Sequence, residues 1–101
     1  MKTELITISE YCIKYAIEPA FIIALEDSGL IVLQEINNDK YIHYKQLVEM
    51  ERYIHFHYEL QINIEGIEAI EGLLTKIKHL QHEIETLKSQ VHLHEQAANI
   101  Q

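Results

Sequence analysis

The chain has 101 residues and a formal net charge of −8, from sixteen Asp and Glu against eight Lys and Arg. This length allows one small domain, or a smaller domain with an appendage. The acidic balance favours a basic protein over DNA as the partner, because DNA affinity depends on Lys and Arg neutralising phosphates. The single cysteine excludes an intrachain disulfide. No signal peptide opens the chain and no apolar run approaches the roughly 18 residues of a membrane-spanning helix, so we expect a cytoplasmic protein.

Two short helices are predicted near the start of the chain. Thr7 and Glu10 have the spacing of a capping box, in which each side chain accepts from the other residue's backbone N–H, so a helix is expected over about residues 8–16. Pro19 suits the first position of a second helix, where its missing N–H costs nothing. Gly29 marks the end of that helix. Two helices joined by a tight turn are typical of a helix-turn-helix.

The next segment has the pattern of a β-hairpin. Residues 31–33 are rich in β-branched side chains, residues 37–39 (Asn-Asn-Asp) are typical of a turn, and a second apolar segment follows at 41–44. We expect two strands that form the wing of a winged helix, and a further short strand could form at residues 5–6. Residues 45–58 then return to helical spacing.

A long final helix is predicted from Ile64 to about Glu95. Asn63 is suited to its N-cap, since the side-chain oxygen can accept from the exposed N–H groups of the first turn. Ile62 and Ile67 have the spacing of a hydrophobic staple across that cap. The sequence therefore predicts a junction here, with short elements before it and one long helix after it.

The later part of this helix has apolar residues alternately three and four apart, which is a heptad pattern. β-branched residues at position a with Leu at position d favour two strands when the helices are parallel. We therefore expect a winged helix-turn-helix domain over residues 1–74 and a coiled-coil-like tail over 75–101 that forms a homodimer. The alternative is that the apolar stripe packs back on the globular part. The predicted self-association residues are Ile77, Leu80, Ile84, Leu87 and Val91.

This order of elements resembles the MerR-type DNA-binding domain. The similarity is carried by T-I-S-E-Y-C at residues 7–12, by S-G-L at 28–30 and by the start of the last helix. Within that superfamily the chain looks most like the chaperone modulator CbpM family, whose H-E-L-type tripeptide and capped, glycine-containing helix start correspond to residues 58–67. Tyr58 and Glu65 replace the usual His and Pro of that pattern. The resemblance implies a mainly α fold, a MerR-like winged helix-turn-helix with a small β-hairpin wing and a long C-terminal helix.

The departures from MerR regulators suggest a function. Those proteins carry an Arg-x-Tyr in the second helix to contact DNA, whereas the equivalent residues here, Ile23-Ala24-Leu25, can hydrogen-bond no phosphate. Their wing also contains an arginine that residues 41–44 lack. The resemblance therefore implies a DNA-binding fold without its DNA-contacting groups.

CbpM proteins bind the J-domain of a CbpA-type Hsp40 co-chaperone, inhibit its work with Hsp70 and restrain its DNA binding. The resemblance implies the same role for this chain. Two alternatives stay open: a MerR-like transcription regulator that binds DNA, and a coiled-coil dimerisation module without a fixed client.

Two acidic surfaces are candidates for contact with the J-domain, whose second helix is basic in the partners of this family. Glu65, Glu68 and Glu71 share one face of the last helix at three-residue spacing. Glu10, Glu26 and Asp27 lie on and near the helix-turn-helix. An ordinary solvated face would have the same composition, so the sequence does not choose between these surfaces.

No residue pattern points to catalysis, to a cofactor or to a metal. His79, His82 and Glu83 could face the same way on the last helix, but no cysteine pair supports them as ligands. We expect the histidines to be exposed, with some pH sensitivity. Cys12 falls within an apolar pattern, so a buried thiol is expected. We therefore predict a protein that is not an enzyme.

Overall fold

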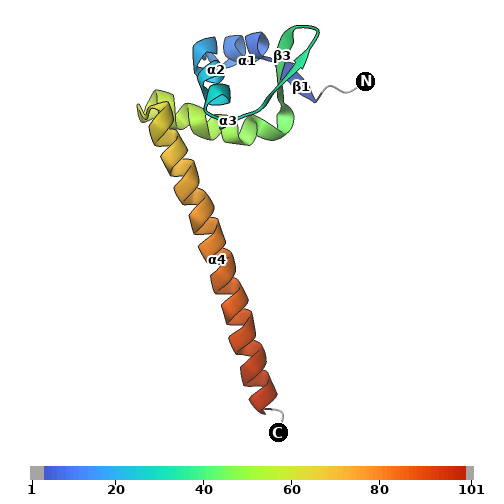
Figure 1. Ribbon diagram of the computed structural model, residues 1–101, viewed down its shortest axis with the longest axis vertical. Coiled ribbons are helices and arrows are strands. Elements are labelled where there is room, and N and C mark those ends of the chain that lie inside the picture. The colour runs from blue at the N-terminus through green and yellow to red at the C-terminus, as the bar shows by residue number, and fades with distance from the viewer. Residues whose placement is uncertain (1–3, 100–101) are drawn as a thin grey trace. The chain divides into compact units, whose positions relative to one another are not determined.

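The computed structural model describes residues 4–99 and contains two compact units, Met1–Glu68 and Ala69–Gln101. The first unit holds three short helices, a three-stranded sheet and the start of the last helix, and the second unit is the rest of that helix (Figure 1). The predicted fold class, mainly α with a small β-hairpin and a long C-terminal helix, is confirmed. The predicted domain boundary, after residue 74, lies within the helical second unit.

The helix-turn-helix consists of α1 (Ile8–Tyr15) and α2 (Pro19–Asp27). The predicted capping box is present at the start of α1. The Glu10 N–H donates to Thr7 Oγ1 over 3.0 Å, and the Thr7 N–H donates to Glu10 Oε1 over 3.3 Å. Because these bonds satisfy N–H groups that the helix itself cannot, they determine where α1 begins.

Both helices end at a residue with a left-handed backbone conformation. Ala16 has a φ of 55° after α1, and Gly29 has a φ of 84° after α2. After α2, the Leu30 N–H donates to the C=O of Leu25, and the Gly29 N–H donates to the C=O of Glu26, both over 3.0 Å. This pair of bonds is a Schellman motif, which reverses the chain toward the hairpin.

The hairpin consists of β2 (Leu33–Ile36) and β3 (Asp39–His43), joined by Asn37 and Asn38. Both asparagines have positive φ, 52° and 70°, as a type I′ turn requires. The strand considered at residues 5–6 forms as β1 (Leu5–Thr7) and pairs antiparallel with β3. The wing is therefore part of a three-stranded sheet with the order β1-β3-β2.

The first strand of the hairpin begins at Leu33, later than the apolar run predicted. Ile31 is buried in the core instead. The Val32 N–H and C=O bond to the side-chain amide of Gln46, over 2.8 and 2.6 Å. Since Gln46 satisfies these backbone groups, they do not pair with β3. The prediction of a strand over 31–33 is therefore wrong for its first two residues.

The helix predicted over residues 45–58 consists of three different helical turns. A 3-10 turn, η1 (Tyr44–Gln46), precedes α3 (Leu47–Ile54), and a π-helical turn, η2 (His55–Glu59), follows it. In this π-turn the Leu60 N–H donates to the C=O of His55 over 3.1 Å, the wider spacing of a π-helix. A wider turn changes which side chains face inward, so helical periodicity does not predict it.

The core of the first unit is formed by α1, α2, α3, β3 and the first turns of α4 (Ile64–Asn99). Ile67 of α4 is fully buried, together with Ile22, Leu25, Ile42 and Met50. Burying an isoleucine side chain stabilises the fold by about 2 kcal/mol. The start of the long helix is therefore part of the globular core. The other buried residues are Tyr11, Cys12, Ile17, Phe21, Ile31 and Tyr53.

The start of α4 is built around Asn63, as predicted. Asn63 Oδ1 accepts from the Gly66 N–H over 2.8 Å, and its C=O accepts from the Ile67 N–H over 2.9 Å. Ile62 packs against the core to which Ile67 belongs, which agrees with the predicted staple. A Cβ atom on Gly66 would lie 2.6 Å from Ile62 Cγ2 and 3.1 Å from Asn63 Oδ1. The junction therefore requires glycine for space.

Replacing Gly66 with alanine should lower the free energy of unfolding by about 1 kcal/mol, because the new methyl group displaces the staple or the cap. Alanine is otherwise the better helix former by about 1 kcal/mol, so the sign of the change is informative. Gly72→Ala is the matched control, since nothing lies within 4 Å of a Cβ there, and it should stabilise the helix. Urea denaturation followed by circular dichroism measures both. An equal gain in both variants would contradict this account of the junction.

Cys12 is buried, as predicted, and burial raises the pKa of its thiol. The thiolate is the reactive species, so little of it forms in the native protein at neutral pH. We expect Ellman's reagent to react slowly with the native chain and rapidly with the chain in concentrated denaturant. Equal rates in the two conditions would show that the thiol is accessible.

Candidate functional site

The second helix of the helix-turn-helix, α2, presents no cation to solvent. Phe21, Ile22 and Leu25 pack into the core. Leu25 belongs to the triplet at the position of the Arg-x-Tyr of MerR regulators, and Ile23 in the same triplet is exposed but apolar. DNA affinity depends mainly on Lys and Arg at the phosphates, so this face is poorly suited to a duplex. The exposed residues of α2 and its N-cap are Glu18, Pro19, Ala20, Ile23 and Asp27.

The lysine of the hairpin, Lys40 on β3, is bound to α2. Its Nζ lies 2.9 Å from Oε1 of Glu26. The hydrogen bond to Glu26 raises the pKa of Lys40, and the charges of Glu26, Glu35 and Asp27 act in the same direction. Lys40 therefore joins the wing to the helix-turn-helix, and its charge is matched by carboxylates within the chain.

The predicted docking residues lie on different elements. Glu26 and Asp27 are at the end of α2, where Glu26 is in the ion pair with Lys40. Glu65 and Glu68 are exposed on the first turns of α4, within the first unit, and Glu71 belongs to the second unit. Within residues 4–99, neither Glu65 nor Glu68 has an ion-pair partner. The charge at the end of α2 is thus partly neutralised, whereas the charge at the start of α4 is not.

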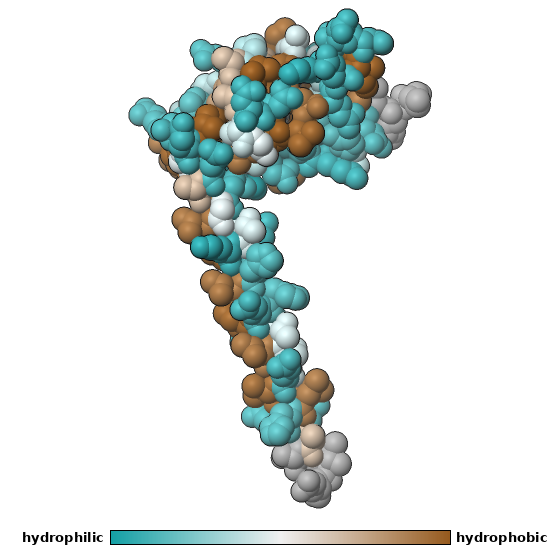
Figure 2. Space-filling model, in the orientation of Figure 1, coloured by the Kyte–Doolittle hydropathy of each residue, from teal (hydrophilic) through white to brown (hydrophobic). Residues whose placement is uncertain are grey.

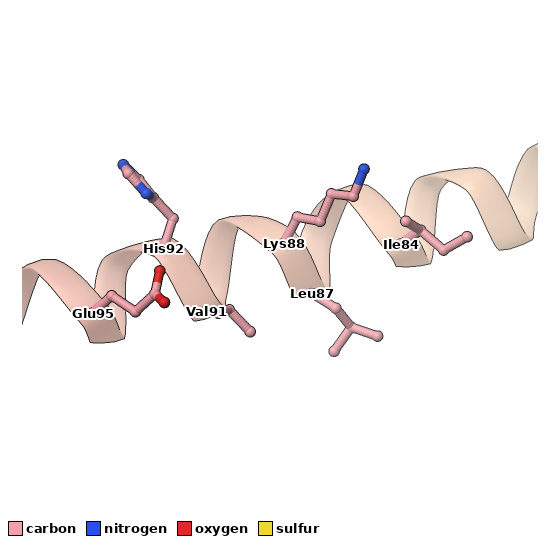
Figure 3. Close-up of a pocket in the computed structure, with 6 residues that line it drawn as sticks. All are labelled: Ile84, Leu87, Lys88, Val91, His92 and Glu95. Atoms are coloured by element: carbon pink, nitrogen blue, oxygen red, sulfur yellow. The ribbon is translucent and has the colours of Figure 1, made fainter.

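The predicted self-association stripe is exposed along the second unit, and Figure 2 shows hydrophobic side chains following one side of the helix. In the close-up of its C-terminal part, Leu87 and Val91 project in the same direction, while Lys88 and His92 project from the other edge of the helix in this view (Figure 3). Leu73 is also exposed and occupies the preceding d position, so the heptad pattern begins earlier than predicted. The five predicted residues, Ile77, Leu80, Ile84, Leu87 and Val91, are 47–59% exposed.

Two aromatic side chains, His57 and Tyr58, anchor the π-turn on α2. The His57 ring stacks on Phe21 with centroids 4.3 Å apart, and His57 Nδ1 donates to the C=O of Ile62 over 3.1 Å. Tyr58 meets Phe21 edge-on at 5.4 Å, and its hydroxyl accepts from the Glu18 N–H over 3.1 Å. His57 is therefore half-buried and not exposed as predicted. The sequence signal for this packing is the unbroken run of aromatic rings at residues 55–58.

Other histidines make local contacts. His43 is also half-buried and not exposed as predicted; its Nδ1 accepts from the Lys45 N–H over 3.0 Å and so caps η1. His55 Nδ1 contacts the Glu59 carboxylate within the π-turn. Across residues 4–99 no three His, Cys, Asp or Glu side chains converge in a way that could hold a metal ion. No helix in the same range has the length and hydropathy needed to cross a membrane.

Comparison with known proteins relates this architecture to a family. Residues 6–89 match the protein-family model described as "MerR HTH family regulatory protein". The match runs from β1 through the helix-turn-helix, the hairpin and α3 into α4. No curated protein and no solved structure matches the chain. Because the matched stretch includes most of the sequence, the chain belongs to the MerR helix-turn-helix family of regulatory proteins.

Proposed function

We propose that this chain is a non-enzymatic, CbpM-like chaperone modulator that binds the J-domain of a CbpA-type Hsp40 co-chaperone and inhibits its co-chaperone activity. The observation that carries the proposal is the surface of α2. In a MerR-family fold, this helix and its N-cap present Asp27 and Glu18 where a DNA-binding protein needs cations. The lysine of the wing, Lys40, is already paired with Glu26. A regulator with these surfaces is better suited to contact a basic protein than a duplex.

The charge of the whole chain supports a basic partner. The net charge is −8, and the CbpM resemblance implies a J-domain whose second helix is basic because it meets an acidic Hsp70. A protein that covers this helix would compete with Hsp70 for it. Complementary charge would speed the encounter and set its orientation more than it would add affinity.

The second candidate function is a DNA-binding transcription regulator, which the family match itself favours. In this case the affinity would have to come from exposed lysines outside α2, such as Lys14 and Lys45. Each phosphate contact changes the slope of log affinity against log salt by about −0.9. So few contacts would give weak binding with a shallow salt dependence.

Calorimetric titration of the full chain with the isolated J-domain, at two salt concentrations, tests the proposal. We expect a dissociation constant of about 1 μM or tighter that weakens as salt rises, because salt screens the attraction between exposed charges. The control is a J-domain in which the basic residues of this helix are replaced with uncharged ones, and it should bind less tightly. A gel-shift series on the chain's own promoter tests the second function in parallel. If the chain shifts its promoter DNA and does not bind the J-domain at tens of micromolar, the transcription-regulator function replaces the chaperone-modulator function as the better proposal.

We also propose that a second copy of the chain covers the apolar stripe of α4, which gives a homodimer. β-branched residues at a and Leu at d suit a two-stranded contact. In the same heptads Glu83 occupies position g and Lys88 position e, so a parallel pair would place Glu83 of one copy beside Lys88 of the other. Each buried leucine would contribute about 2 kcal/mol to the association.

The double variant Leu80→Glu/Leu87→Glu should be monomeric, with the dimer dissociation constant raised at least about a hundredfold. His82→Glu/Ser89→Glu is the matched control, because it adds the same two carboxylates at f positions, away from the stripe, and should leave the dimer intact. Sedimentation equilibrium measures both. The first unit should stay folded in each variant. A wild-type chain that is monomeric at high concentration, or a double variant that unfolds completely, would contradict this division of the protein.

A further inference from the structure

The turn before α4 presents an exposed leucine on an ordered backbone. Leu60 is 53% exposed. Its N–H donates to the C=O of His55 over 3.1 Å, and the Ile62 N–H donates to the C=O of Phe56 over 2.9 Å. Gln61 between them has a φ of 58°, a left-handed conformation that closes the turn. Because these bonds already order the backbone, a partner that covers Leu60 costs little further backbone conformational entropy.

Tyr58 adds a second apolar group and brings α2 to the same place. Its hydroxyl is bound to the Glu18 N–H over 3.1 Å and its ring packs on Phe21, yet 39% of the residue remains exposed. The exposed parts of Tyr58 and Leu60 therefore lie on the same turn, which is bonded to the N-cap of α2. This arrangement lies entirely within the first unit.

Carboxylates accompany these two apolar side chains. Glu18 and Glu59 are exposed at the turn, and Glu65 and Glu68 are exposed on the helix that starts directly after it. The segment 53–75 contains no lysine or arginine. Glu59 also contacts His55 within the turn. At the other candidate surface, at the end of α2, Glu26 is already in an ion pair with Lys40.

We infer that the basic helix of the J-domain docks on this acidic turn surface, which we define by Glu18, Tyr58, Glu59, Leu60, Glu65 and Glu68. Tyr58 and Leu60 supply the apolar centre and the carboxylates supply the rim, which is the usual anatomy of a protein interface. Charge complementarity selects a basic occupant, because unpaired carboxylates at the rim repel an acidic one. The inference rests on the proposed function and chooses between the two acidic surfaces that the sequence left open.

Calorimetry with paired variants of the full chain tests the surface. Leu60→Asp should weaken J-domain binding by about tenfold or more, since a central apolar contact becomes a buried charge. Ile13→Asp is its matched control, because Ile13 is an exposed apolar residue on α1, 84% exposed, and this change should have no effect. The double variant Glu65→Gln/Glu68→Gln should weaken binding several-fold and reduce its salt dependence, whereas Asp27→Asn should do neither.

Hydrogen exchange of the wild-type complex gives a second measurement that does not depend on how any variant folds. Amides of residues 58–68 should gain protection when the J-domain binds. Protection at residues 24–28 instead, or unchanged affinity in both Leu60→Asp and the double variant, would overturn the acidic turn surface and leave the proposed function standing. If the wild-type chain itself does not bind the J-domain, the proposed function falls and this surface falls with it.

Discussion

The burial of Ile67 behind the Asn63 cap connects the globular part of this chain to its long helix. A long helix with a largely polar surface receives most of its stability from packing, and this first turn is the part of α4 that belongs to the core of the first unit. The cap and the staple occupy the space beside Gly66, where a side chain would collide with Ile62. The start of α4, the core of the first unit and the turn before the helix therefore depend on one another at this junction.

The chain has the fold of a regulatory family, but its helix α2 offers no lysine or arginine to solvent. The helix-turn-helix and wing of the MerR family are present, but the exposed surface of α2 carries carboxylates and apolar groups. Lys40 strengthens the wing's attachment to α2 by pairing with Glu26. Lys40 therefore serves the fold, and a family fold by itself does not give the function of its members.

The π-turn is where local pattern and observed structure differ most. Helical periodicity places His57 and Tyr58 on a continuous helix, but the wider turn directs both rings onto Phe21. It also leaves Leu60 exposed at the point where the chain changes direction. Single π-helical turns often occur at functional sites, because the wider turn changes the direction of side chains without ending the helix. Here the exposed side chains of Tyr58, Glu59 and Leu60 follow one another on the same turn.

By itself the sequence determined the elements whose signals are local: the Thr7–Glu10 capping box, the Gly29 stop, the Asn37–Asn38 turn and the Asn63 cap. Each depends on residues a few positions apart, and the chemistry of those residues is sufficient. Only the tertiary structure decided which groups are already paired and which remain available. The bond between Tyr58 and Glu18 joins residues 40 positions apart, and the Lys40–Glu26 and Gln46–Val32 contacts each join residues 14 apart. Such contacts depend on how separate elements pack, which no local pattern specifies.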